Sequence, residues 1–480
     1  MDKVARLQAL GADPFVPGSA IPRTHLAGSL QRELESLPAG SRAEEASYGC
    51  VAVAGRVMSK RVMGSMAFCG LEDPSGTLQL CFREGEDRET VGSPGSSESH
   101  TSPESSESSG SPAWSDSCSS PNTNDASISS ALSPNLPPPR PLTFAHLFRE
   151  GLLDVGDVVT ALGSVRRTPR GELSLDVSAC TIASKCLRPL PDKRRGLLDP
   201  DARLRARHVD LLTRPGARRP LLARAAALKS IRARLDKGGF VEVETPVLEA
   251  QAGGAEARPF RTHHEALKRD LVLRIAPELH LKRLVVGGLE RVYEIGRNFR
   301  NEGLSARHNP EFSSLEVYQA WADYRDMMAL TEDLLRQAAL AVHGTAKLPY
   351  QGQELDFESP FRRVTMQQSV AEALGVDFGR YGFAQGRSAQ VVGSRHDLAG
   401  AKQDLLRALP ADAPAGTRQQ VSSAPSLGLL LQTVFEACVE PLLLQPTFVT
   451  LLPVEVSPLA AAHRSLADVT ERFELFAAGR

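Results

Sequence analysis

Residues 291–319, "RVYEIGRNFRNEGLSARHNPEFSSLEVYQ", contain two runs of alternating side chains with a charged connection between them. Alternation of this kind predicts β-strands, because successive side chains of a strand point to opposite faces. The first strand is expected over 291–302, and the second returns from Phe312 to Tyr318. Two strands joined in this way predict a sheet with one polar face and one apolar face.

The polar face of this strand pair is the main candidate for a binding site. Arg300 and Glu302 are expected on it from the first strand, and Glu316 and Tyr318 from the second, with helices against the opposite face. A guanidinium binds carboxylate or phosphate oxygens in pairs, whereas Glu suits an ammonium or a ribose hydroxyl. The set therefore fits a ligand with phosphate, ribose, carboxylate and amine groups. A simple pairing of Arg300 with Glu302 across the strand is the structural alternative.

The length and composition of the chain restrict the other possibilities. At roughly 100–200 residues per domain, 480 residues predict two or three domains. The formal net charge of -1 provides no overall basic field, so DNA is not an expected partner, and any contact with RNA or nucleotides must come from local patches. No apolar run approaches the ~18–20 residues of a membrane span, so no membrane association is expected.

The expected location is the cytoplasm, with an organelle as the open alternative. The first residues, "MDKVARLQALGADPF", have no long apolar core of a secretory signal. The seven Cys form no CxxC pair, which favours free thiols in a reducing compartment and gives no zinc-type spacing.

Changes in composition and residue pattern along the sequence predict four segments. Residues 1–45 are expected to form an amphipathic helical extension. Alternating strands over 46–188 predict a small β-barrel such as an OB-fold, interrupted by a disordered Ser- and Pro-rich insertion over 85–141. A basic linker follows over 189–219, either solvated or facing RNA. The remainder, 220–480, is expected to be an α+β domain.

The order of elements in the last segment favours antiparallel pairing rather than a βαβ arrangement. A helix is expected before Gly238–Gly239 and another over 324–343, ending at Gly344. The sequence has no GxxxxGK[ST] and no strand-borne GxGxxG, so the common nucleotide-binding folds are not supported.

Three runs, "GGFVEVETPVL", "RIAPELHLKRLVVGGLERVYEIGRNFRNEG" and "RHNPEF", resemble class II aminoacyl-tRNA synthetases of the lysine, aspartate and asparagine subgroup, specifically the lysyl-tRNA synthetases. The similarity is dense over about 185–330, returns at "QPTFVTLLPVEVSPLA" and "TERFELF", and is weaker in the barrel. It implies an OB-fold that binds the anticodon and an antiparallel catalytic sheet of six or seven strands. It also implies a homodimer, with residues 228–246 at the interface.

The resemblance also implies roles for individual residues. Arg300 would be the catalytic residue, holding the ATP α-phosphate and the lysine carboxylate. The ATP-binding residues implied are Arg300, Glu302, His308, Asn309 and Phe312, with Phe312 stacking on adenine. The lysine-binding residues implied are Gly253, Gly254, Glu278, Arg300, Glu316 and Tyr318. In the barrel, Phe68 would stack on an anticodon base with Arg61 near by, and packing of Phe68 in the core is the alternative.

The implied reaction is ATP-dependent ligation of L-lysine to tRNA(Lys), with ATP as a substrate and Mg²⁺ as the metal. In the family, the magnesium-binding acids and the third motif follow the strand that matches "TERFELF", so the metal ligands are expected beyond residue 480. The expectation for these 480 residues alone is weak activity or none. The alternatives are a catalytically inactive paralogue that binds tRNA or a partner, motivated also by Ala461 in place of a basic residue, and an aspartyl- or asparaginyl-tRNA synthetase.

Overall fold

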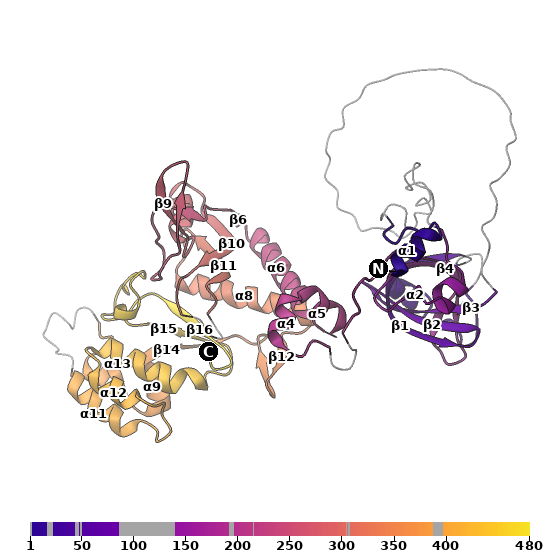
Figure 1. The fold of residues 1–480 in the computed structure, drawn as a ribbon. Helices are drawn as coiled ribbons and strands as arrows, with labels where there is room; N and C mark the ends of the chain where they lie inside the picture. The colour runs from indigo at the N-terminus through magenta and orange to yellow at the C-terminus, as the bar shows by residue number, and fades with distance from the viewer. Residues whose placement is uncertain are drawn as a thin grey trace, which may run out of the picture. The chain divides into compact units, whose positions relative to one another are not determined.

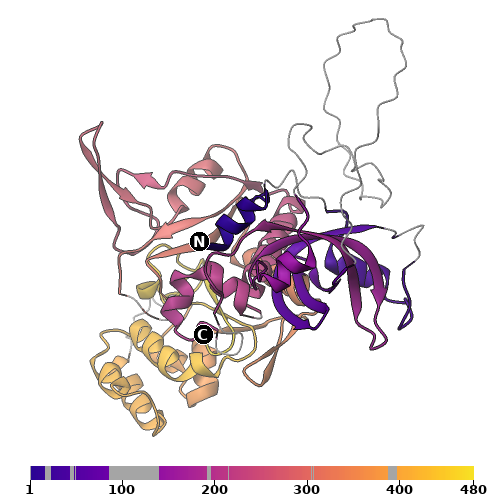
Figure 2. The same cartoon turned by 45° about the vertical axis from the view of Figure 1, so that its right-hand side comes forward.

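The structure is a computed structural model that describes residues 2–16, 23–43, 48, 50–85, 140–191, 196–214, 216–303, 305, 308–386 and 397–480. The chain divides into two compact units, residues 1–215 and 216–480, which are considered separately. Figures 1 and 2 show the elements of both units. The insertion predicted over 85–141 lies almost entirely outside the described residues.

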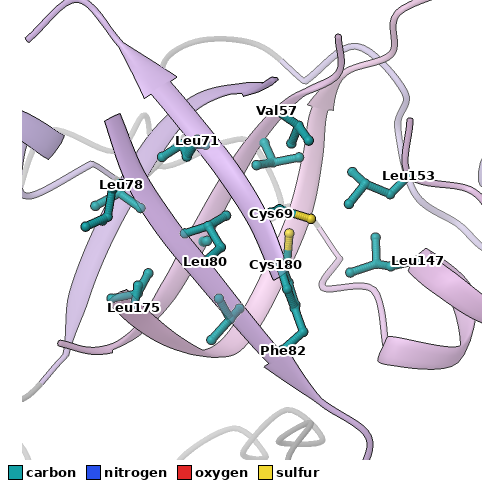
Figure 3. Packing of buried hydrophobic residues seen from close by; sticks show 14 of the residues in the cluster. Val57, Cys69, Leu71, Leu78, Leu80, Phe82, Leu147, Leu153, Leu175 and Cys180 are labelled. Carbon is teal, nitrogen blue, oxygen red and sulfur yellow. The ribbon is translucent and has the colours of Figure 1, made fainter. Parts of the chain in front are cut away.

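The first unit is built on a closed five-stranded barrel with strand order β1-β2-β3-β5-β4. Its strands are β1 (Val51–Met63), β2 (Met66–Asp73), β3 (Gly76–Arg83), β4 (Val158–Arg167) and β5 (Leu173–Ser184). Along β2, Ala67, Cys69 and Leu71 are buried and alternate with partly exposed residues. Figure 3 shows the interior, where Cys69, Leu71, Leu80 and Cys180 pack together. The barrel predicted from the alternation is confirmed.

Short helices pack on the barrel, and two more come after it in the chain. Leu7 of α1 (Asp2–Ala9), Leu30 of α2 (Ala27–Glu33) and Leu147 of the helical turn η3 (Ala145–Arg149) belong to the barrel core. The unit then continues into two more helices, α4 (Pro200–Arg205) and α5 (Arg207–Thr213). The N-terminal helices therefore pack on the barrel through apolar side chains.

The second unit begins with a sheet of order β11-β10-β6, packed on two helices. The strands are β6 (Val241–Glu242), β10 (Arg291–Phe299) and β11 (Glu311–Gln319), and the helices are α6 (Arg219–Lys237) and α8 (Tyr324–His343). Leu235 of α6 and Leu334 of α8 form a cluster with Tyr293, which is completely buried on β10. The predicted apolar face, packed on helices, is confirmed.

The ends of α8 lie where the sequence predicts them. The Asp323 side chain accepts a hydrogen bond from the Arg325 backbone N–H, within a capping box completed by Asp326. Gly344 ends the helix in the left-handed conformation, with φ of 72°, which Gly adopts without steric cost. Local capping interactions therefore define both ends of this helix.

The other elements of the second unit surround this sheet. One further sheet has the order β7-β9-β8, with β7 (Leu248–Glu249), β8 (Arg261–His264) and β9 (Arg269–Leu273), and is followed by α7 (Glu278–Val286). A hairpin is formed by β12 (Lys347–Tyr350) and β13 (Gln353–Asp356). The third sheet has the order β14-β15-β16, with β14 (Arg362–Thr365), β15 (Thr447–Thr450) and β16 (Phe473–Phe476).

A helical cluster lies between β14 and β15 in the chain and has its own apolar core. Its members are α9 (Met366–Leu374), η4 (Phe378–Tyr381), α11 (Leu398–Ala408), α12 (Thr417–Ser423), α13 (Leu427–Val434), η5 (Phe435–Val439) and η6 (Glu440–Leu442), with η7 (Val454–Val456) after β15. The α+β class is therefore confirmed. No helix among the described residues has the length and apolarity needed to cross a bilayer.

The predicted antiparallel sheet requires one correction. β10 pairs with β11 in antiparallel orientation, as expected, but β6 and β10 run parallel, and so do β14 and β15. Parallel neighbours need long crossovers, and here α7 and the β7-β9-β8 sheet lie between β6 and β10 in the chain. Alternation within strands does not reveal this, because it carries no information about which strands become neighbours.

Candidate active site on the β10–β11 strand pair

The register of β10 and β11 sets the polar face. Glu294 lies directly opposite Glu316, and Asn298 lies directly opposite Phe312. Directly opposite residues project from the same face of a sheet. Tyr318 also projects from this face, two residues beyond Glu316. Glu316 and Tyr318, both expected on the polar face from the second strand, therefore lie on that face.

The position of Glu302 differs from the prediction. β10 ends at Phe299, not at residue 302. The Arg300 backbone N–H still donates to the Pro310 carbonyl at 2.9 Å, but the Asn301 N–H donates to the Arg258 carbonyl at 2.7 Å. This second bond turns the chain away from β11. Glu302 consequently lines a shallow hollow of about 700 Å³, together with residues 256–258, Asn301 and Gly303, and its predicted place on the strand face is wrong.

Arg300 is held at the end of the strand pair by a ring and a carbonyl. The guanidinium carbon lies 5.1 Å from the centre of the Phe312 ring, within range of a cation–π interaction. The Arg300 Nε lies 3.4 Å from the Ile275 carbonyl oxygen, to which it donates. The two residues implied for the α-phosphate and the adenine are thus in contact.

An acidic group lies farther along the same face. The Tyr318 hydroxyl donates to Glu316 Oε2 at 3.1 Å. Burial raises the pKa of the Glu316 carboxyl above its usual range, the nearby Glu278 raises it further, and the hydrogen bond from Tyr318 opposes this rise. Burial and the Glu316 charge also raise the pKa of Tyr318. A carboxylate in such a place is stabilised by a cation, such as an ammonium group.

Two glycines place a loop against the first turn of α7, where Glu278 lies. At Gly254, with φ of +81°, an added Cβ would lie 2.8 Å from the Glu278 Cβ. At Gly253, an added Cβ would lie 2.5 Å from the Leu279 Cδ1. At Gly254, with its positive φ, only a residue without a Cβ allows this approach. The structure therefore brings together Gly253, Gly254 and Glu278, and Glu278 accepts a hydrogen bond from Lys282 Nζ at 2.6 Å.

A buried ion pair lies on the same polar face, and the sequence reasoning missed it. Arg274 Nη1 donates to Glu294 Oε1 at 2.6 Å and to Thr245 Oγ1 at 2.9 Å. Both charged side chains are at most 4% exposed. The available signal was the charge in the apolar run "LVLRIAP". A charge there must find a buried partner, because isolated burial is costly.

His308 and Asn309 lie on the exposed connection between the two strands. The His308 Nδ1 and the Ser305 Oγ are 2.8 Å apart, and both side chains are exposed. Residues 304, 306 and 307 lie outside the described part of the chain. The two residues thus follow Arg300 in the chain and precede Phe312 without being packed in the core.

In the barrel, Arg61 and Phe68 lie directly opposite each other on β1 and β2. Ala67 and Cys69, the neighbours of Phe68, are buried, so Phe68 projects from the outer face. Arg61 is exposed. The core-packing alternative for Phe68 is therefore not supported, and the two side chains form one outward-facing pair.

A family model described as "tRNA synthetases class II (D, K and N)" matches residues 199–480. This range includes the strand pair, α7 and the loop with the two glycines. The polar face therefore belongs to the segment that matches a class of synthetases.

Comparison with curated proteins gives a narrower result. The chain is 42% identical to a "Lysine--tRNA ligase" of Thermosynechococcus vestitus, over all of this chain and 79% of that protein. It is 43% identical to that of Prochlorococcus marinus strain MIT 9303, over all of this chain and 80% of the relative, and 41% identical to that of a Nostoc species, over 72% of the relative. The chain therefore belongs to the class II tRNA synthetases and, within them, to the lysine–tRNA ligase family.

Proposed function

We propose that the protein is a lysine–tRNA ligase that activates lysine with ATP on the β10–β11 face and transfers it to tRNA. The observation that carries this proposal is the distribution of charge along one face. Arg300 and Phe312 lie at one end, and the acids Glu316 and Glu278 lie near the other. Phe312 and Glu316 are four residues apart on β11, which corresponds to about 13 Å along a strand. That span suits an aminoacyl-adenylate with its adenine at Phe312 and its ammonium group at the acids.

The first step joins the two substrates. The lysine carboxylate attacks the α-phosphorus of ATP in line, the bond to the β-phosphate oxygen breaks, and pyrophosphate leaves. Arg300 holds the carboxylate and an α-phosphate oxygen, and so reduces the repulsion between two anions as they approach. Glu302, His308 and Asn309 would contact ATP from the connection between the strands. Phe312 offers a ring for adenine once Arg300 turns to the phosphate.

In the second step, a terminal ribose hydroxyl of the tRNA attacks the carbonyl carbon of the lysyl-adenylate, and AMP leaves. No protein nucleophile is needed in either step. Glu278, Gly253 and Gly254 would surround the lysine α-amino group, because the glycines bring the loop backbone close to the carboxylate. Glu316 and Tyr318 would receive the side chain.

The family implies magnesium, which proteins often hold through one or two carboxylates together with substrate phosphates. Within the described ranges of the chain, no group of three or more His, Cys, Asp or Glu side chains could hold a metal ion.

The barrel is the proposed contact for the tRNA anticodon. The outward ring of Phe68 offers a surface on which an unpaired base can stack, and Arg61 offers charge to a phosphate. A cytoplasmic location stays a prediction.

A homodimer is also proposed, supported by exposed apolar side chains in the second unit. Leu222 on α6 is 68% exposed, Val241 on β6 is 48% exposed, and Trp321 beyond β11 is 93% exposed. Of these three, Val241 lies within residues 228–246, the segment that the resemblance implies for the interface. Sedimentation equilibrium of the full-length protein measures the association, and a monomer at micromolar concentration would contradict it.

Exchange of pyrophosphate into ATP tests the first step. In the full-length protein, Arg300→Lys is expected to lower lysine-dependent exchange about 10²–10³-fold, because one ammonium cannot replace the two-pronged contact of a guanidinium. Arg297→Lys is the matched control, since Arg297 lies on the opposite face of the same strand and faces Glu311 at 3.6 Å. Equal losses in both variants would contradict the assignment of Arg300.

A further inference from the structure

Arg274 has no part in the reaction as described, although its side chain lies on the face where the reaction is proposed. The residue follows β9 and is 2% exposed. Its Nε donates to the Arg297 carbonyl oxygen at 2.9 Å, and its Nη1 donates to Thr245 and Glu294. A second bond from Thr245 Oγ1 to Glu294 Oε2, at 2.7 Å, closes the network.

Gly296 locates the guanidinium on the polar face. A Cβ added at Gly296 would lie 2.1 Å from Arg274 Nη2 and 2.9 Å from Glu294 Oε1. Gly296 lies between Glu294 and Asn298 on β10, and both of these project from the polar face. The absence of a side chain at Gly296 therefore provides the room that the guanidinium occupies.

Two carboxylates lie beside this buried cation, and a third lies beyond them. Glu294 is bonded to it, Glu316 lies directly opposite Glu294, and Glu278 acts on Glu316 from α7. Among the described residues near this region, Tyr318 donates to Glu316, Lys282 donates to Glu278, and His280 on α7 pairs with Glu249 on β7 at 2.8 Å.

We propose that Arg274 is a positioning residue that sets the charge of the lysine subsite without touching the substrate. It neutralises Glu294, so that Glu316 stays ionised beside Glu278 and binds the ammonium group of the lysine side chain. Without Arg274, three acids would compete for charge in a half-buried space, and one would take up a proton. The inference rests on the proposed function, because it assumes that Glu316 meets the substrate cation.

The direction of the Glu316 pKa supports this reading. Burial raises the pKa, and Glu278 and Glu294 raise it further, whereas Tyr318 and Arg274 lower it. Removing the Arg274 charge should therefore raise the Glu316 pKa more, and neutralising Glu294 should lower it. The two single changes have opposite signs, which a purely structural role would not produce.

The test compares Glu294→Gln, Arg274→Gln and the double variant in the full-length protein. The KM for lysine and the KM for ATP are measured by pyrophosphate exchange between pH 6 and 9. Glu294→Gln leaves an uncompensated cation beside the subsite, and its lysine KM should rise about tenfold at every pH, since one pKa unit of interaction corresponds to tenfold in affinity. Arg274→Gln should give a lysine KM that rises steeply as the pH falls, because Glu316 becomes protonated.

The double variant distinguishes an electrostatic role of Arg274 from a purely structural role. Two Gln residues can hydrogen-bond each other and carry no charge, so the lysine KM and its pH profile should return to within about threefold of the wild type. The ATP KM should change less than twofold throughout, as it should in the control Arg297→Gln. If Arg274→Gln fails to fold, the comparison of Glu294→Gln with the double variant still decides.

Two outcomes overturn different claims. If the lysine KM and the ATP KM rise together, and the double variant is no better than the single variants, Arg274 is only a structural residue. If the full-length wild-type protein shows no lysine-dependent exchange at any pH, the proposed function itself fails.

Discussion

Each unit of this protein contains a buried ion pair, and the two pairs have different neighbours. In the barrel, Lys185 Nζ bonds to Asp157 and Asp154, both at 2.7 Å, and to the Leu152 carbonyl oxygen. Asp157 is completely buried and also accepts the backbone N–H of Cys186 at 2.7 Å. Its partners join the loop before β4 to the end of β5, so this pair holds barrel segments together.

In the second unit, Arg274 and Glu294 are buried to a similar degree but lie next to Glu316 on the proposed substrate face. Burying two charges is costly in either place, and the cost is offset only when every charge is well bonded. The comparison teaches that burial and bond lengths alone do not distinguish a structural pair from a functional one. The proposed distinction lies in what is adjacent: Asp154 and backbone groups in the barrel, and Glu316, the carboxylate proposed to meet the substrate, in the second unit.

The largest expected effect is on the stability of the barrel. Lys185→Met removes the buried cation and leaves Asp157 uncompensated, which should destabilise the first unit by about 3–5 kcal/mol. Hydrogen exchange of barrel amides, followed by mass spectrometry, measures this loss, while the lysine KM should stay within twofold. The control is Lys3→Met, because Lys3 bonds only the more exposed Asp154 and should contribute about 1 kcal/mol or less. A changed lysine KM in Lys185→Met would contradict the claim that the barrel ion pair acts only on stability.

The pH dependence of barrel stability has a defined sign. Burial would raise the pKa of Asp154, but hydrogen bonds from Lys185 and Lys3 outweigh it and hold the pKa below its usual range. A carboxyl with a lowered pKa in the folded state stabilises the fold above its unfolded pKa of about 3.9, and this contribution is lost as the pH falls below that value. In Lys185→Met this contribution to stability should become smaller, because only Lys3 then remains to lower the pKa of Asp154.

Within the proposed lysine subsite, the largest effect is expected at Glu316. Glu316→Gln keeps the shape of the side chain and removes its charge, so the lysine KM should rise about 10–100-fold with the ATP KM nearly unchanged. The matched control is Glu311→Gln on the same strand, since Glu311 lies opposite Phe299 and projects from the other face. A rise of both KM values to the same extent would remove Glu316 from the lysine subsite.

The smallest effect is expected on the outer face of the barrel. Phe68→Ala should raise the KM for tRNA about tenfold in aminoacylation, because one stacked base is lost, and pyrophosphate exchange should not change. Phe68→Tyr retains the ring and should behave as the wild type. An equal loss of exchange activity in Phe68→Ala would show that the residue acts on folding and not on tRNA.

The sequence predicts those features that depend on local rules. Alternating apolar residues such as Leu173, Leu175 and Val177 predict the barrel strands, and Gly344 predicts the end of α8. Strand parity also predicts the shared face of Glu316 and Tyr318. The resemblance supplies the residues of the candidate site, and the structure brings Arg300 into contact with Phe312.

The remaining features depend on contacts between distant segments. Glu302 leaves the strand face because the Asn301 N–H bonds to Arg258, which lies 43 residues earlier in the chain. The partner of Arg274 is Glu294, and periodicity gives no rule for such a pairing. The parallel orientation of β6 and β10 likewise follows from the path of the chain between them and not from the side chains within either strand.

The central claim is that the acids on the β10–β11 face select a cationic amino acid. Pyrophosphate exchange by the full-length wild-type protein, with lysine, aspartate or asparagine as the sole amino acid, tests it most directly. The account predicts robust exchange with lysine and only background exchange with the other two. Exchange that depends on aspartate or asparagine, or that occurs without any amino acid, would contradict it.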